Sequence, residues 1–346
     1  MSIAIINDST IYTGLGRYAT NLACATNAKL ISLNLDSSIA PWKYPGMVTS
    51  SHKVFKIGTG WYLNNRFPSL FLSRIKKQIE NQIDPITLIH YSSQNIPHLN
   101  LKNRYVFTVH DTFGLGSKSS SNTRFKKLIK INLKYIQSSE RIIAVSNYTR
   151  SQLHKFGIDG KVDVIYPPVS RTFKSLGEPI SIRKILGLPE NKKLVLNVSS
   201  QEPRKNLKVV AETMKHLGNE YKLVRVGSPV GECYSFINID DEKLNMIYNA
   251  CDVLLFPSLD EGFGYPLAEA MTVGLPVVAS DIPVFHEIAE NSALLVEPDP
   301  EKLAGGIKDA AADSDTFRDH GIQIAKRYSF DRFKDDINEF YKRIMV

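Results

Sequence analysis

The stretch that decides the fold is residues 253–287, VLLFPSLDEGFGYPLAEAMTVGLPVVASDIPVFHE. It opens with the apolar run 253–256, which is short and rich in residues that favour a buried strand. Pro266 stands where a helix prefers its first residue, good helix formers follow it, and Gly274 ends the helix. Residues 277–279 begin another strand, so the pattern predicts a strand–loop–helix–strand unit. Open parallel sheets bind ligands at the carboxyl ends of their strands, where this loop lies.

Two carboxylates mark this unit, Glu261 in the loop and Glu269 eight positions later in the helix. About two helical turns separate them, on the order of 10 Å, which suits two ends of one extended ligand better than a pair acting on one bond. The nearby glycines let the backbone approach a ligand, and the helix start offers N–H groups to phosphate. Taken alone, each Glu would also fit a helix cap or a solvated helix face.

Residues 257–280, PSLDEGFGYPLAEAMTVGLPVVAS, resemble the signature of retaining GT-B glycosyltransferases of family 4, which use nucleotide-sugars. Asp281-Ile282-Pro283 and Glu287 continue the same pattern. The resemblance implies that Glu261 is a catalytic residue near the donor sugar and that Glu269 holds the ribose hydroxyls. It also implies that the donor is bound by three residues of the loop, Gly262, Phe263 and Gly264.

Length and composition indicate a two-domain globular protein of 346 residues, of which 43% are hydrophobic and 23% charged. No apolar run approaches the roughly 18 residues of a spanning helix, and the N-terminus has no signal-peptide shape, so we expect a cytoplasmic protein. Cys24, Cys233 and Cys251 have no metal-binding spacing, so we expect free core thiols in a reducing compartment.

The positive charge is concentrated in the first half of the chain. Residues 1–170 hold 21 Lys and Arg against 8 Asp and Glu, a net of +13, whereas the whole chain has +8. Residues 122–137 predict an amphipathic helix with Lys127, Lys130 and Lys134 on one face. A solvated face is the ordinary interpretation, but the excess of one sign also favours an anionic membrane surface or a lipid-phosphate acceptor. We expect no nucleic-acid partner.

Near the N-terminus, Gly14, Gly16 and Ala19 follow a predicted strand, with Asp36 further on, in a pattern typical of dinucleotide binding. That fingerprint requires the strand to run directly into the first glycine, and seven residues intervene here, which argues against a NAD-dependent oxidoreductase. The glycosyltransferase family often has a Gly-rich loop followed by Arg-Tyr at this place. The resemblance therefore implies that Gly14, Gly16 and Arg17 bind the donor phosphates.

Two further segments supply catalytic candidates at strand ends. Residues 105–109 predict a buried strand that ends in His110 and Asp111, and in the family such a His reaches the donor sugar. Residues 193–197 predict a strand that leads to Pro-Arg-Lys-Asn at a helix start, where Arg204 and Lys205 form a strong anion site. This segment resembles the family's diphosphate-binding loop, although many members have Gly-Arg where Ser199-Ser200 stands.

The strand and helix pattern predicts an α/β protein. The family resemblance implies GT-B architecture, with two Rossmann-like domains facing a cleft and a C-terminal helix that crosses back to the first domain. The expected domains are 1–168 and 169–327, and the returning helix is 328–346. The expected activity transfers a hexose, mannose from GDP-mannose before a UDP-sugar, to a glycan or lipid-linked acceptor. Asp313-Ser314-Asp315 matches a metal motif in letters only, so we expect no metal and no cofactor. The alternatives are a GT-B sugar-nucleotide epimerase and a catalytically silent sugar-nucleotide-binding protein.

Overall fold

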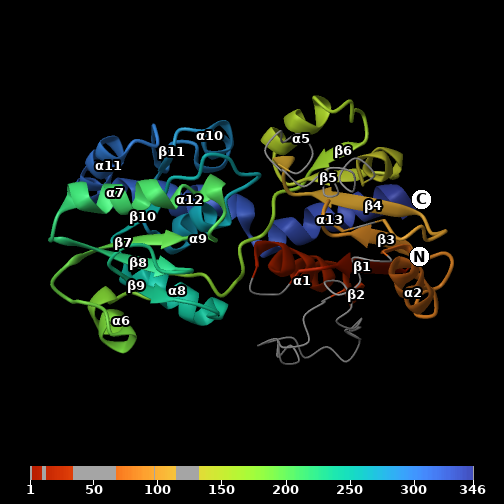
Figure 1. The fold of residues 1–346 in the computed structure, drawn as a ribbon, viewed down its shortest axis with the longest axis horizontal. Helices are drawn as coiled ribbons and strands as arrows, with labels where there is room; N and C mark the ends of the chain where they lie inside the picture. The colour runs from red at the N-terminus through yellow and green to blue at the C-terminus, as the bar shows by residue number, and fades with distance from the viewer. Residues whose placement is uncertain (1, 10–12, 34–67, 97, 114–131, 346) are drawn as a thin grey trace. The chain divides into compact units, whose positions relative to one another are not determined.

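The structure is a computed structural model of the chain, and it describes residues 2–9, 13–33, 68–96, 98–113 and 132–345 (Figure 1). The residues form two compact units, one of Met1–Tyr166 with Phe333–Val346 and the other of Pro167–Arg332. The chain therefore enters the second unit just before our expected boundary at 168. It returns to the first unit at Phe333, a few residues later than our expected boundary at 328.

The first unit is built on a parallel sheet of six strands in the order β2-β1-β3-β4-β5-β6. The strands are β1 (Ile3–Asn7), β2 (Lys29–Ser32), β3 (Leu88–Tyr91), β4 (Tyr105–Val109), β5 (Ile142–Ala144) and β6 (Val162–Val164). The helices with assigned bounds are α1 (Gly14–Thr26), α2 (Pro68–Glu80), α5 (Asn147–His154) and α13 (Phe330–Met345). The central strands are nearly continuous apolar runs because helices cover both faces of a parallel sheet.

The second unit repeats this architecture, with a parallel sheet in the order β12-β11-β10-β7-β8-β9. Its strands are β7 (Lys193–Val198), β8 (Tyr221–Val226), β9 (Cys233–Phe236), β10 (Val253–Phe256), β11 (Val277–Ser280) and β12 (Leu294–Val296). Its helices are α6 (Pro179–Leu186), α7 (Leu207–Leu217), α8 (Asp241–Ala250), α9 (Tyr265–Val273), α10 (Pro283–Ala289), α11 (Pro300–Ala312) and α12 (Ser314–Ala325). The strand–loop–helix–strand prediction for 253–279 is confirmed, because β10, α9 and β11 follow in that order.

The C-terminal helix α13 returns to the first unit, as the family resemblance implied (Figure 1). Its Tyr341 hydroxyl hydrogen-bonds to Nδ1 of His90 in β3, and Asn338 donates to the carbonyl of Ala25 at 3.3 Å. Arg343 pairs with Asp163 in β6 at 3.1 Å. The helix is therefore held by a buried hydrogen bond to β3 and by polar contacts to helix α1 and to the edge strand β6.

Two predictions of detail, on Gly14 and on Cys24, need correction, and a third, on the helix 122–137, falls partly outside the residues that the structure describes. Gly14 and its neighbours form the first turn of α1, capped by the Thr13 hydroxyl, and are not a loop. Cys24 is exposed, whereas Cys251 is buried as expected, and all three cysteines are free thiols. Within the predicted helix 122–137, Lys127 and Lys130 lie outside the described residues; residues 132–138 are helical and Lys134 is exposed.

Candidate active site

The second unit gathers its candidate residues at the carboxyl edge of its sheet. Strand β7 lies next to β10, and both run parallel, so the loops that follow them emerge at the same edge. The loop after β7 contains the short helix η1 (Pro203–Lys205), and the loop after β10 carries Glu261. The backbone N–H of Leu259 donates to the carbonyl of Arg204 at 2.8 Å, which fastens the two loops to each other.

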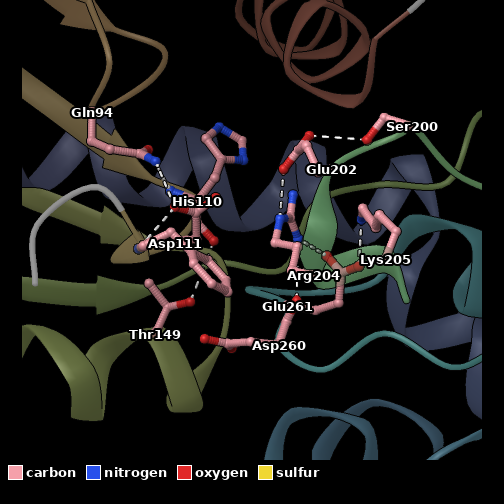
Figure 2. Close-up of polar contacts among 11 residues, drawn as sticks. Gln94, His110, Asp111, Thr149, Ser200, Glu202, Arg204, Lys205, Asp260 and Glu261 are labelled. Carbon is pink, nitrogen blue, oxygen red and sulfur yellow. Dashed lines mark hydrogen bonds and ion pairs between the residues drawn. The ribbon is translucent and has the colours of Figure 1, made fainter. Parts of the chain in front are cut away.

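Arg204, Lys205 and Glu261 form one ion cluster in this unit (Figure 2). Nη1 of Arg204 donates to Oε2 of Glu261 at 2.8 Å, and the Lys205 ammonium donates to its other carboxylate oxygen. The Glu261 side chain is only 8% exposed, against 20% for Arg204 and 11% for Lys205. Charge-assisted hydrogen bonds of this kind are short and strong, so the cluster presents two cations in a fixed arrangement.

Glu202 adds a second carboxylate to the cluster. Its Oε2 accepts from Nε of Arg204 at 2.7 Å, and its Oε1 accepts from the Ser200 hydroxyl at 3.0 Å. Partial burial acts to raise the pKa of Glu202, but the hydrogen bond and charge of Arg204, with Ser200 and Lys205, outweigh it and lower that pKa. Glu202 is therefore ionised at neutral pH, and the two cations of the cluster face two carboxylates.

The loop before α9 has little freedom. Gly264 has φ +97°, and a Cβ there would lie 2.9 Å from Cε1 of Phe285, so a glycine is required. Phe263 is buried, with its ring edge-on to Tyr265 at 5.5 Å and to Tyr328 at 5.2 Å between centroids. The Phe263 side chain thus packs in the interior, and any contact with a donor has to come from its backbone.

Glu269 lies in the middle of α9 and is 1% exposed. Its Oε2 accepts a hydrogen bond from the Tyr248 hydroxyl of α8 at 2.8 Å. This contact fixes one carboxylate oxygen in orientation. Because Glu269 is buried, the solvated helix face considered for a lone Glu does not apply to it.

In the first unit, His110 follows β4 directly and is 8% exposed (Figure 2). Its Nε2 lies 2.9 Å from the carbonyl oxygen of Ser92, which can only accept, so Nε2 carries the proton. Burial lowers the pKa of His110 to about 4, against an opposing effect of this hydrogen bond, so the ring is neutral at pH 7. Its Nδ1 is then an acceptor, suited to a hydroxyl group.

The backbone and ring of His110 are both held in place. Its N–H donates to Oε1 of Gln94 at 2.9 Å, and the amide of Gln94 donates to Asp111 at 3.2 Å. The ring stands edge-on to Tyr18, with centroids 4.7 Å apart. Tyr18 is itself buried and bonded to Thr108 at 2.9 Å, so the orientation of the imidazole is determined by the core of the unit.

Two of the N-terminal candidates, Gly16 and Arg17, have their backbone N–H groups bonded within the first turn of α1. The N–H of Gly16 donates to the Thr13 hydroxyl at 3.1 Å, and the N–H of Arg17 donates to the Thr13 carbonyl at 3.0 Å. Gly14 and Arg17 are partly exposed in the same first turn of α1. The positive end of the helix dipole, rather than a flexible loop, is what this segment offers to an anion.

Sequence reasoning missed Glu202, Gln94 and Arg225 as polar residues of these strand-end regions. The position of Glu202 two residues before Arg204 was a usable signal, whereas Arg225 is hidden in an apolar strand. Asp313 ends α11 and Asp315 pairs with Arg318 one turn later, so the Asp-x-Asp letters belong to a helix junction. Within the described residues, no group of three or more His, Cys, Asp or Glu is arranged to hold a metal ion.

Among the described residues, no helix is both long enough and apolar enough to cross a membrane.

Comparison with known proteins matches both units. Residues 12–173 match the family described as Glycosyltransferase Family 4, and residues 180–328 match Glycosyl transferases group 1. The chain is 28% identical over 261 residues to the O-antigen chain mannosyltransferase RfbU of Salmonella typhimurium, covering 69% of each protein. It is 27% identical to the O-antigen chain mannosyltransferase B of Escherichia coli, covering 42% of this chain and 45% of that protein.

The fold has solved counterparts. The crystal structure of Anabaena Alr3699/HepE in complex with UDP and glucose superposes with a TM-score of 0.78 and 17% identity, covering 99% of both chains. That similarity establishes an α/β two-domain GT-B fold, with the two parallel six-stranded sheets described above. The two family matches together span most of the chain. Both families are glycosyltransferases, as are the two named relatives. This chain belongs to the group 1 glycosyltransferases of the family 4 type.

Proposed function

We propose that this glycosyltransferase is a retaining, metal-independent mannosyltransferase that uses GDP-mannose and extends a glycan or lipid-linked acceptor. The names of the relatives from Salmonella typhimurium and Escherichia coli, both O-antigen chain mannosyltransferases, support mannose as the sugar. The family resemblance supports retention of configuration. A UDP-sugar is the second candidate donor, because Alr3699/HepE was crystallised with UDP and glucose. An epimerase or a silent binding protein is not favoured by these relatives.

The observation that carries the proposal is the cluster of Arg204 and Lys205 at the carboxyl edge of the second sheet. In the reaction the bond between the anomeric carbon and the diphosphate oxygen breaks, and negative charge grows on the leaving diphosphate. A preorganised guanidinium and ammonium oppose that growing charge without rearranging at the moment of reaction. This is the electrostatic work that a metal ion does in other transferases, and it underlies the proposed independence from metal.

Glu261 and Glu269 have different proposed roles. Glu261 bonds to both cations and holds them in place beside the donor sugar. Glu269, oriented by Tyr248, accepts hydrogen bonds from the ribose hydroxyls. In the first unit the neutral His110, with Nδ1 as an acceptor, receives a hydroxyl of the sugar.

The acceptor side of the proposal rests on charge. The net +13 of residues 1–170 and the exposed Lys134 support docking on an anionic membrane surface or binding of a lipid-phosphate acceptor. Each basic residue near an anionic surface contributes about 1 kcal/mol, and salt screens the attraction. Sedimentation with vesicles of varied anionic lipid content tests this. Binding should require anionic lipid and fall with salt, and a protein that ignores such vesicles at low salt excludes the membrane role.

The main test is a donor and acceptor assay with variants of the cluster. We expect sugar transfer from GDP-mannose to be faster than from UDP-glucose. Arg204→Ala and Lys205→Ala should each lower kcat at least about tenfold, since removal of one such donor typically costs about 10²–10³ in rate. Lys215→Ala is the matched control, because Lys215 pairs with Glu212 on the exposed face of α7. Wild-type rates in both cluster variants would remove the diphosphate assignment.

A further inference from the structure

Arg225 is a buried cation at the edge of the second sheet that the proposed mechanism has not used. It is the second-last residue of β8 and has 0% exposure. Its guanidinium donates to the Ser228 carbonyl at 2.7 Å, to the Ser199 carbonyl at 2.8 Å and to the Ser199 hydroxyl at 3.0 Å. It also donates to the side-chain oxygen of Asn197. Every one of these acceptors is neutral.

Arg183, the other buried arginine of this unit, has a carboxylate among its partners. It donates to the carbonyls of Ala250 at 2.7 Å and Lys192 at 3.1 Å, and it also pairs with the carboxylate of Asp252 at 2.8 Å. Arg225 has no such ion pair among the residues that the structure describes. Burial of an ion without a counter-charge is unfavourable, and burial accordingly lowers the pKa of Arg225, although an arginine stays protonated.

The position of Arg225 ties it to the diphosphate loop. Ser199, which receives two of its hydrogen bonds, directly follows β7 and begins the loop that leads to Arg204 and Lys205. Close to this contact, Gly227 has φ +133°, and a Cβ there would lie 2.4 Å from the Ser199 carbonyl oxygen. The strand end is therefore packed tightly around Ser199, and the guanidinium binds both the carbonyl and the hydroxyl of the residue that begins the loop.

The two cations of the loop, Arg204 and Lys205, are already paired with carboxylates, so an anionic ligand would gain from a further cation. Arg204 bonds to Glu202 and Glu261, and Lys205 bonds to Glu261, so two cations face two carboxylates. A nucleoside diphosphate brings at least two further negative charges to this edge of the sheet. A fixed cation without a carboxylate partner lowers the electrostatic potential energy of that ligand, and the ligand in turn offsets the cost of burying the cation.

We propose that Arg225 is a positioning residue of the donor site, which holds Ser199 and supplies the uncancelled positive charge that favours binding of the donor diphosphate. The inference rests on the proposed function, because it assumes a nucleotide-sugar as ligand. It also offers an answer to the departure at Ser199-Ser200, where many family members have an arginine. The arginine charge that is missing at Ser199-Ser200 is supplied by Arg225 on β8, the strand next to β7.

The test is calorimetric titration with GDP and UDP, each paired with its uncharged nucleoside, guanosine or uridine. Arg225→Gln keeps an amide donor for Ser199 and removes the charge. We expect it to weaken binding of the preferred diphosphate at least about tenfold, or about 1.4 kcal/mol. Affinity for the nucleoside should stay unchanged. Arg183→Gln is the matched control, because it removes a buried arginine of the same unit and should not change diphosphate affinity. Arg225→Lys should restore a large part of the loss.

The outcomes separate the two proposals. If the wild type binds neither diphosphate, the proposed function fails, and this inference fails with it. If the wild type binds one of them and Arg225→Gln binds it equally well, the role of Arg225 is refuted while the function stands. An equal loss for diphosphate and nucleoside would show a merely structural role. If Arg225→Gln does not fold, Arg225→Lys becomes the test because it keeps the positive charge. A fall of more than about threefold in its selectivity for diphosphate over nucleoside would overturn the proposal.

Discussion

Replacement of Gly264 by alanine should destabilise the second unit by an amount that the geometry allows us to estimate. The left-handed conformation at φ +97° costs an L-residue about 1–2 kcal/mol. The added Cβ would lie 2.9 Å from Cε1 of Phe285, a fully buried ring packed on Phe256 at 5.3 Å between centroids. Overpacking of this kind costs about 1–3 kcal/mol, so the expected loss is about 2–5 kcal/mol.

The Phe285 ring must move to make room for the added Cβ, and this movement should also shift the cluster of Arg204, Lys205 and Glu261. The Lys205 ammonium lies 5.6 Å from the centre of the Phe256 ring, which is the neighbour that Phe285 must push. We therefore expect Gly264→Ala to lower transferase activity as well as stability. A loss of activity without any loss of stability would contradict the steric explanation.

Scanning calorimetry measures the stability change. A loss of 1 kcal/mol lowers Tm by about 2–4 °C in a domain of this size, so Gly264→Ala should melt at least about 4 °C lower. Gly305→Ala is the matched control, because Gly305 lies in helix α11 with nothing within 4 Å of an added Cβ. Alanine there should stabilise by about 0.5–1 kcal/mol. Equal melting temperatures for Gly264→Ala and the wild type would refute the reasoning.

Three further predictions concern the site. Glu269→Ala should weaken nucleoside diphosphate binding about tenfold or more, since hydrogen bonds to a charged group contribute about 1.5–3 kcal/mol; unchanged affinity in calorimetry would refute the ribose role. Transferase activity should survive excess EDTA, and its abolition with rescue by Mn²⁺ or Mg²⁺ would contradict metal independence. His110 has a folded pKa of about 4, below the ordinary 6.5. Between these values the unfolded chain binds the extra proton, so stability should fall as pH drops from about 6.5 to 4, by about 3 kcal/mol from this group. His110→Gln should lose less stability than the wild type over this range in pH-dependent urea unfolding, and equal slopes would show that His110 is not the group responsible.

The sequence alone was sufficient for the architecture. Apolar runs such as 253–256 and 105–109 are interrupted by Gly, Pro and polar residues at regular places, and that pattern is local, so it can be read without the fold. The return of the C-terminal helix came from the family resemblance, not from periodicity. The ends of elements depend on single capping contacts: the Thr13 hydroxyl accepts from the Gly16 N–H, so Gly14 lies in the first turn of α1 and not in the predicted loop.

The tertiary structure decided which candidates touch one another. Glu261 lies 56 positions after Lys205 in the sequence, and it meets Arg204 and Lys205 only because β7 lies beside β10. Glu202 and Tyr248 were found only through their contacts with Arg204 and Glu269. Charge state was also a tertiary property, since burial and the Ser92 carbonyl determine that His110 is neutral. A local pattern specifies strands and helices, but burial and counter-charges depend on strand order, and no periodicity in the chain encodes strand order directly.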